Sequence, residues 1–254
     1  MVQWGGCPIT PLKSLITSLI DSPMVESLVG IERDAFLWLN SLHSIYLDSV
    51  MFFISDKWPW ILFVVLFLFL MSFGQKKGEV ILLLLGIALL VVLADGISSG
   101  IIKQIFQRAR PTYHPLTQDV VKTVLGHRGG GYGFVSGHTA NFFAFSLFAS
   151  LVIRNRLFTI ASFVVATTVA YSRIYLGMHF ITDVLPGLLL GLACGWFCYW
   201  LYSESRVAFL DVPRREGRDS YLCPRERRQT MGILMTIFFI LIWITAPFFF
   251  QYYS

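Results

Sequence analysis

Three short polar stretches interrupt a very apolar chain, and each carries residues suited to holding or transferring an oxyanion. The first stretch contains Lys103 and Arg110, seven residues apart, followed by Pro111. On a continuous helix that separation is close to two turns, so we expect the two cations to share a face. Arginine binds phosphate oxygens bidentately, but a basic cluster beside a membrane also holds anionic lipid headgroups. Taken alone, the stretch supports both interpretations.

The second stretch is rich in glycine and ends in Ser136, Gly137 and His138, directly before an apolar segment. Ser136 suits the N-cap of a helix, and the free amides at a helix start form an anion site. Gly137 allows the backbone to approach a ligand closely. The alternative interpretation is a flexible loop with a capping serine and an incidental histidine.

The third stretch contains Arg173, His179 and Asp183. His179 and Asp183 are four residues apart, and positions with this spacing meet on one helical face. A carboxylate bonded to one ring nitrogen fixes the imidazole tautomer and leaves the other nitrogen free to attack or to accept a proton. A structural His–Asp pair is the alternative, although ionisable groups near a membrane core indicate function by default.

The three stretches together contain the groups that phosphoryl transfer to a histidine requires. Cations and backbone amides would stabilise the charge on the phosphoryl group. One histidine would attack the phosphorus, and the other would protonate the leaving oxygen. This chemistry needs all three stretches on the same side of whatever scaffold carries them.

The composition indicates that the scaffold is a membrane-embedded helix bundle. The 254 residues are 56% hydrophobic and only 14% charged, with a mean hydropathy of +0.66, whereas soluble domains carry about 25% charged residues. The apolar residues run in blocks, which suits lipid as the solvent. We therefore predict an all-α, polytopic membrane bundle of about six transmembrane helices, at 59–73, 80–102, 139–153, 157–172, 185–202 and 231–250.

Four regions follow from this layout. Residues 1–58 form an N-terminal interfacial segment with an amphipathic helix over 35–55, broken by polar Asn40, His43 and Asp48. Residues 59–202 form a membrane core that carries the three polar stretches. A basic loop over 203–230 and a C-terminal transmembrane helix over 231–254 complete the chain. Asp95, inside the second span, is expected to make a packed polar contact with Ser98, Ser99 or the backbone.

Lysine and arginine in the connections predict the orientation of the bundle. Lys76 and Lys77, Arg154 and Arg156, and the arginine-rich 203–230 loop fall on one side if six spans alternate. The positive-inside rule makes that side cytoplasmic and leaves the three polar stretches on the other. The net charge of +5 is spread over the ends of apolar blocks, so we expect a membrane and an anionic substrate as partners rather than nucleic acid.

The three stretches resemble the three signature motifs of the type 2 phosphatidic acid phosphatase family, which shares its phosphate pocket with vanadium haloperoxidases. The resemblance implies that His179 is a nucleophile forming a phosphohistidine and that Asp183 orients it. It implies that His138 is the acid for the leaving group and then the base for water. The phosphate oxygens would be held by Lys103, Arg110, Ser136, Gly137 and Arg173. It further implies an enzyme without a metal or other cofactor.

One position departs from the family pattern, because Val135 stands where the family usually has proline before Ser-Gly-His. Proline would fix the backbone that leads into the helix cap, so we expect modest loss or altered substrate fit. The role of Arg108, beside Arg110, stays open between a substrate contact and a solvated or headgroup role.

The resemblance places the protein in a bacterial inner membrane with its active site on the periplasmic face. Undecaprenyl diphosphate is the first expectation for the substrate, with phosphatidylglycerol phosphate, phosphatidate and lipid A phosphates as alternatives. Two other classes remain open. One is a metalloenzyme with His138, His179 and Asp183 as ligands, and the other is a non-catalytic lipid-phosphate binder or transporter. The sequence leaves the oligomeric state open.

Overall fold

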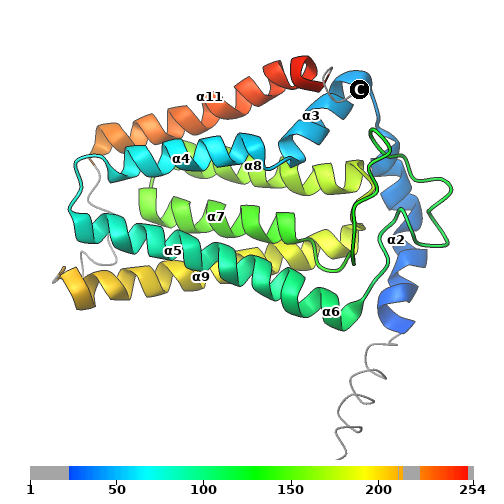
Figure 1. The fold of residues 1–254 in the computed structure, drawn as a ribbon, viewed down its shortest axis with the longest axis horizontal. Helices are drawn as coiled ribbons and strands as arrows, with labels where there is room; N and C mark the ends of the chain where they lie inside the picture. Colours follow the sequence, from blue (N-terminus) through cyan, green and yellow to red (C-terminus); the bar gives the residue numbers. More distant parts are fainter. Residues whose placement is uncertain (1–22, 211, 214–223, 251–254) are drawn as a thin grey trace, which may run out of the picture.

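The structure is a computed structural model that describes residues 23–210, 212–213 and 224–250. Within these ranges every regular element is helical, as predicted (Figure 1). The elements are α2 (Pro23–Ser41), α3 (Ile45–Ser55), α4 (Trp58–Ser72), α5 (Lys77–Asp95), the π-helix η1 (Gly96–Ile102), α6 (Lys103–Phe106), α7 (Gly137–Ile153), α8 (Arg156–Tyr175), α9 (Ile181–Leu210) and α11 (Arg225–Phe250).

Each of the six predicted spans corresponds to a helix, but the helices differ in length. Four are long and apolar enough to cross a membrane, namely the α5–η1–α6 run, α8, α9 and α11. The α3–α4 pair passes the same test only when its members are taken together, across a bend of 51°. Helix α7 is apolar but has only 17 residues, and α9 continues to Leu210 instead of ending at residue 202.

The prediction of one interfacial helix over 35–55 is wrong, because α2 ends at Ser41 and a new helix begins at Ile45. The side chain of Ser44 caps α3 by accepting a hydrogen bond from the Leu47 amide at 3.2 Å. The polar residues that interrupt the apolar pattern anchor this corner. The Asn40 amide donates to the carbonyl of Tyr175 at 2.8 Å, and His43 Nδ1 lies 2.7 Å from an Asp48 oxygen.

Helix α7 lies at the centre of the bundle, where it packs against α9, α8 and α5. Its contact with α9 is unusually close because glycines recur every fourth residue of α9. A Cβ atom at Gly187 would lie 2.7 Å from the Ser136 carbonyl oxygen, and one at Gly191 would lie 2.4 Å from that of Ala140. Small residues let membrane helices pack backbone to backbone, so this seam fixes the start of α7 against the start of α9.

Helix α2 lies across one end of the bundle, beside the long connection between α6 and α7 (Figure 1). Val29 and Phe36 are fully buried on its inner face. On its outer face Ile31 is 80% exposed and Trp38 is 65% exposed. The helix therefore covers this end of the bundle and presents an apolar stripe outward.

The basic connections gather at the opposite end. Arg154 and Arg156, from the α7–α8 connection, line a hollow of about 220 Å³ together with Arg225 and Arg228 at the start of α11. Near them, a Cβ atom on Gly74 would lie 3.6 Å from a guanidinium nitrogen of Arg227. These three connections thus share one end of the bundle, as the alternation of spans predicts.

The α7–α9 seam generates a prediction about stability. Changing Gly191 to alanine places a methyl group against the Ala140 carbonyl, and overpacking of this kind costs about 1–3 kcal/mol. We expect a lower midpoint of thermal unfolding in detergent. Gly30→Ala is the matched control, because a Cβ atom there meets no atom within 4 Å and alanine favours the helix by about 1 kcal/mol. Equal midpoints for the two variants would contradict the role of the seam.

Candidate active site

Lys103 directly follows a π-helical segment, η1, in the run of helix that continues from α5. Helix α5 passes into the π-helix η1 at Gly96, and π-helical turns are frequently found at functional sites. Lys103 Nζ lies 3.5 Å from the Ser99 hydroxyl oxygen, and that hydroxyl donates to Asp95 Oδ1 at 3.2 Å. The expected polar contact of Asp95 with Ser99 is therefore present, and it ties Lys103 to the end of the second span.

Arg110 does not share a helical face with Lys103, contrary to the prediction. Helix α6 ends at Phe106, and Gln107 takes a left-handed conformation with φ of 42°. The chain then turns back, and the glycine-rich loop bends around the Arg110 side chain. Arg110 Nε donates to the Gly131 carbonyl at 3.3 Å, and a Cβ atom on Gly129 would lie 3.2 Å from Arg110 Nη1.

Ser136 caps α7 as predicted. Its hydroxyl oxygen accepts from the Thr139 amide at 3.5 Å and from the Thr139 hydroxyl at 2.9 Å. Its amide donates to the Asp183 carbonyl at 3.0 Å. The capping bonds occupy lone pairs of the Ser136 hydroxyl, so its proton remains available for donation to an anion.

Gly137 and His138 follow the cap in the first turn of α7. A Cβ atom on Gly137 would lie 3.2 Å from the Ser98 hydroxyl oxygen and 3.3 Å from that of Ser99. Glycine therefore lets α7 begin directly against η1. The His138 side chain is exposed, so it is accessible to a substrate.

The third polar stretch forms a turn between α8 and α9. Arg173 lies in the last turn of α8, and its carbonyl accepts the His179 amide at 3.1 Å. Helix α9 begins only at Ile181, so His179 and Asp183 do not share a helical face, and that part of the prediction is wrong. They meet because Asp183 Oδ2 accepts the Phe180 amide at 2.9 Å, an arrangement that also caps α9.

The His179 ring lies between its carboxylate and a cation. Nδ1 is 3.5 Å from Asp183 Oδ2, within ion-pair distance but without the angle of a hydrogen bond. Nε2 lies 3.5 Å from Arg110 Nη1, which also donates to the Met178 carbonyl at 3.2 Å. His179 is 1% exposed, so its Nε2 faces the cationic group from a buried position.

Arg173 completes the cationic set from α8. It is buried, and its Nη1 donates to the hydroxyl of Ser55 at the end of α3. Its Nε has no hydrogen-bond partner among the described residues. A buried guanidinium donor without a partner is costly, and a bound anion would satisfy it.

The predicted site residues thus come together at one end of the bundle. His138 interacts electrostatically with a group of four, namely Arg173, His179, Lys103 and Arg110. Burial, followed by the charges of Arg110, Arg173 and Lys103, holds the pKa of His179 well below its usual range. The imidazole is therefore neutral at neutral pH, as a nucleophile must be. No group of three or more side chains that could hold a metal ion occurs among the described residues.

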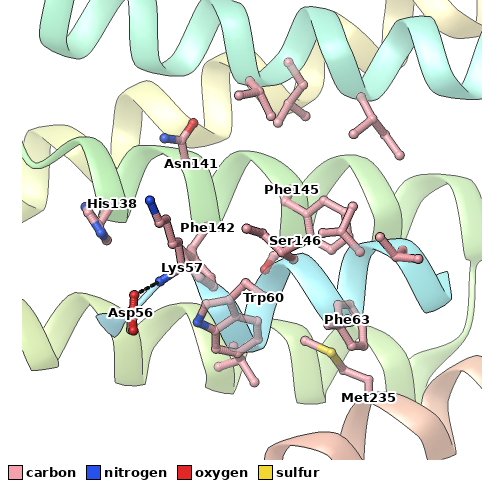
Figure 2. A pocket seen from close by; sticks show the side chains of 17 residues that line it. Asp56, Lys57, Trp60, Phe63, His138, Asn141, Phe142, Phe145, Ser146 and Met235 are labelled. Carbon is pink, nitrogen blue, oxygen red and sulfur yellow. Dashed lines mark hydrogen bonds between the residues drawn. The ribbon is translucent and has the colours of Figure 1, made fainter. Parts of the chain in front are cut away.

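A largely apolar cleft of about 450 Å³ reaches His138 from within the bundle. It lies between α4, α5 and α7, with aromatic walls that include Trp60, Phe142 and Phe145. Figure 2 shows His138 and Asn141 near one another, with Lys57 and Asp56 also bordering the space. One of the two predicted catalytic histidines therefore borders an apolar cleft.

Sequence reasoning missed one residue in the same region, Glu32, and left the role of a second, Arg108, open. Arg108, whose role the sequence leaves open, is 1% exposed and bonded to Asp183 Oδ1 at 2.6 Å. Glu32, on α2, is 8% exposed and bonded to Arg108 at 2.8 Å. Glu32 is three positions after Val29 and four before Phe36, so on a helix it lies on the same face as these two apolar residues. That spacing is a signal that could have indicated an inward-facing carboxylate.

Helices suited to crossing a membrane, together with this cationic site, define an integral-membrane hydrolase acting on lipid phosphates. Residues 79–206 match the family model of the PAP2 superfamily, and the chain belongs to that superfamily. It is 42% identical over 184 residues to the lipid A 4'-phosphatase of Porphyromonas gingivalis, covering 72% of this chain and 78% of that one. A match of 26% identity to the undecaprenyl-diphosphatase BcrC of Bacillus subtilis covers 68% of this chain and 83% of that one.

The fold agrees with that assignment. The crystal structure of Aquifex aeolicus LpxE superimposes with a TM-score of 0.51 at 28% identity, covering 66% of this chain and 94% of that one. The matched family region, 79–206, runs from α5 to α9 and contains all three polar stretches. Helices α2, α3 and α4 lie outside it.

The low pKa of His179 predicts the pH dependence of the reaction. The acid limb of kcat/KM reports protonation of groups in the free enzyme, and Lys103 is one of the cations that lower the His179 pKa. Lys103→Gln removes a positive charge, so the imidazolium forms at higher pH. We expect the acid limb to move to higher pH than in the wild type and kcat/KM at neutral pH to fall roughly 100-fold.

Profiles of kcat/KM between pH 4 and 8 test this prediction with one substrate for both proteins. Titration of the substrate phosphate affects the two profiles equally, so only the difference between them counts. An acid limb that stays in place, or moves to lower pH, would contradict the electrostatic role of Lys103.

Proposed function

We propose that this protein hydrolyses a phosphate ester of lipid A through a phosphohistidine formed on His179. The observation that carries the proposal is the convergence of a buried, neutral His179 with Arg110, Arg173 and Lys103 at one end of the bundle. This charge arrangement suits a tetrahedral phosphate dianion. The lipid A 4'-phosphatase relative supports the choice of substrate.

The reaction proceeds in two balanced steps. In the first, His179 Nε2 attacks the phosphorus, the bond from phosphorus to the ester oxygen breaks, and His138 donates its proton to that oxygen. In the second, His138 removes a proton from water, the hydroxide attacks the phosphorus, and the phosphorus–nitrogen bond breaks to release inorganic phosphate. Asp183 stabilises the positive charge that develops on the His179 ring in the first step.

Phosphate oxygens would be held by charge and by directed donors. Arg110 and Lys103 approach from the α6 side, and Arg173 offers its unpartnered Nε from α8. Ser136 would contribute its hydroxyl proton, and Gly137 its amide at the start of α7. Donors arranged before the reaction stabilise the charge that develops in the transition state.

Undecaprenyl diphosphate, the first expectation from the sequence, becomes the alternative substrate. The match to an undecaprenyl-diphosphatase favours it, but at 26% identity rather than 42%. The site itself would bind the phosphate group of a lipid, and either compound has such a group. Phosphatidylglycerol phosphate and phosphatidate also carry a phosphate on a lipid and are further alternatives.

We further propose that the protein lies in a bacterial inner membrane with the active site at the periplasmic face. The arginine-rich end formed by Arg154, Arg156, Arg225 and Arg228 would then be cytoplasmic, as the positive-inside rule requires. Helix α2 would lie in the periplasmic interface with Ile31 and Trp38 in contact with lipid. The residues over 1–22 lie outside the described part of the predicted interfacial segment.

Phosphate release from purified protein tests the proposed function. With a chelator present, we expect inorganic phosphate from lipid A at a kcat/KM at least about tenfold above that from undecaprenyl diphosphate, a difference of about 1.4 kcal/mol. His179→Ala should release no phosphate from either lipid. A wild type that prefers the diphosphate would reverse the choice of substrate without affecting the mechanism.

The intermediate is tested separately with lipid A labelled in its phosphate. A rapid quench in alkali, in which phosphohistidine survives, should leave label on the wild-type protein and none on His179→Ala. His138→Gln lacks the base for the second step, so any label that it acquires should persist longer. Label on His179→Ala, or release by that variant, would contradict the assignment of the nucleophile.

The cleft beside His138 predicts a separate effect on the lipid part of the substrate. Val91 lines the cleft and is 50% exposed, whereas its neighbour Val92 is 66% exposed and does not line it. Val91→Trp should fill space needed by an acyl chain and raise KM for the lipid roughly tenfold, the effect of losing about 1.4 kcal/mol of binding. Val92→Trp is the matched control.

A short, water-soluble phosphate ester provides the second arm of this experiment. Its kcat/KM should be the same in both variants and the wild type, because it has no chain to place in the cleft. Equal KM values for the lipid in Val91→Trp and Val92→Trp would show that the acyl chains bind elsewhere.

A further inference from the structure

Arg108 is held in a fully buried position between two carboxylates. Its Nη1 donates to Asp183 Oδ1 at 2.6 Å and to the Thr182 hydroxyl at 2.7 Å. Its Nη2 donates to Glu32 Oε1 at 2.8 Å. The guanidinium also lies 4.7 Å above the centre of the Phe180 ring. Both terminal nitrogens of Arg108 are bonded within the protein and its side chain is 1% exposed, which favours an internal role over the substrate contact or solvated position that the sequence left open.

The second carboxylate that binds Arg108 belongs to Glu32, on the N-terminal helix α2. Its Oε2 accepts the Thr182 amide at 2.9 Å, and the Thr182 hydroxyl donates to its Oε1. The carboxylate therefore sits at the start of α9, where the free amides and the helix dipole favour negative charge. On the same face of α2, the Phe36 ring packs 5.1 Å from that of Phe180.

We propose that Glu32 and Arg108 are positioning residues for the reaction, and that α2 thereby forms part of the catalytic apparatus. The proposal rests on the function proposed for Asp183 as the partner of His179. Glu32 lies outside residues 79–206, the region that matches the family model. The N-terminal helix would therefore complete a site whose predicted catalytic and phosphate-binding residues all belong to that region.

The geometry gives Arg108 control over where the Asp183 carboxylate points. Oδ1 is fixed by Arg108 and Oδ2 by the Phe180 amide, which leaves Oδ2 facing His179 Nδ1 at 3.5 Å. When His179 attacks, positive charge develops on its ring and this short approach becomes an ion pair. Rotation of the carboxylate away from Nδ1 would forfeit that stabilisation.

Glu32 controls how much of the Arg108 charge Asp183 experiences. A guanidinium paired with Asp183 alone would offset the carboxylate and weaken its attraction for the developing imidazolium. A second carboxylate on the other side of the guanidinium shares that charge. The group of Glu32, Arg108 and Asp183 then has two negative charges against one positive, which favours a cation on His179.

The alternative is that the Glu32–Arg108 pair only fastens α2 to the bundle. A matched control for this alternative is Glu79, in the first turn of α5, at the end of that helix away from the active site. Its buried carboxylate accepts two hydrogen bonds from Arg206 Nε, at 3.1 and 3.0 Å, and one from Arg206 Nη2 at 3.0 Å. Glu79 is 3% exposed and remote from the site. Both carboxylates are buried and arginine-bound, so Glu79→Gln reproduces the structural cost of Glu32→Gln.

Steady-state kinetics and thermal unfolding of the full-length protein in detergent test the proposal. We expect Glu32→Gln to lower kcat by about 10–100-fold, the usual effect of removing a group that supports a ligand or catalytic residue, with KM within about twofold because the phosphate contacts are intact. Arg108→Lys, which cannot bridge two carboxylates in the same way, should lower kcat similarly. Glu79→Gln should lower the unfolding midpoint but leave kcat of the folded protein unchanged.

Three outcomes would overturn the positioning role: a wild-type kcat in Glu32→Gln, a loss confined to KM, or a loss of kcat matched by Glu79→Gln. Asp183→Asn, measured beside them, separates this proposal from the function on which it rests. If Asp183→Asn is inactive while Glu32→Gln has normal kcat, only the role of Glu32 fails. If Asp183→Asn and His179→Ala both retain activity, the proposed mechanism fails as well.

Discussion

The site depends on placing several cations around one buried, neutral histidine. Arg110, Arg173 and Lys103 repel one another and repel a proton on His179, and burial strengthens both effects. A phosphate dianion among these cations would relieve this repulsion, so the arrangement favours an anionic substrate. Without such an anion, a cluster of like charges at the end of an apolar bundle would be a net cost. The remaining structure serves to hold these groups at fixed separations.

The fold holds them with backbone contacts more than with side chains. The α7–α9 seam brings the Ser136 amide to the Asp183 carbonyl, because Gly187 and Gly191 leave no side chain between the helices. The glycine-rich loop accepts a hydrogen bond from the Arg110 guanidinium with one carbonyl, and the last turn of α8 accepts the His179 amide with another. Backbone contacts of this kind change little when side chains move, which suits a site that needs accurate spacing.

The sequence predicted which residues gather, but not how. Lys103 and Arg110 were expected on one helical face, yet the helix ends at Phe106, and His179 precedes the helix that carries Asp183. In both cases the residues selected by the family spacing lie close together, while the assumption of a regular helix through these segments was wrong. Strained or irregular backbone at such segments is common.

The roles of Arg108 and Glu32 could not be predicted from the sequence, because they depend on burial and on contacts between distant parts of the chain. Arg108 has the same residue type and nearly the same position as Arg110, and only the three-dimensional contacts separate an internal residue from one that faces the site. Glu32 bonds to Thr182 across 150 positions of the chain, and no local pattern encodes a pairing of that length. The positions of the six apolar helices, by contrast, followed from apolar blocks, because each block reflects its own contact with lipid.

Substrate choice must arise outside the phosphate site, because the groups that hold phosphate would bind any phosphorylated lipid. The regions able to discriminate are those that meet the remainder of the molecule. In the proposed complex, the apolar cleft would receive acyl chains, and Lys57 and Asn141 at its polar end would lie beside the group next to the phosphate. Lys57 belongs to the α3–α4 corner, which lies outside the matched family region, as Glu32 on α2 does. The α3–α4 corner is therefore one part of the chain where a lipid phosphatase can diverge from another while the phosphate-binding residues stay the same.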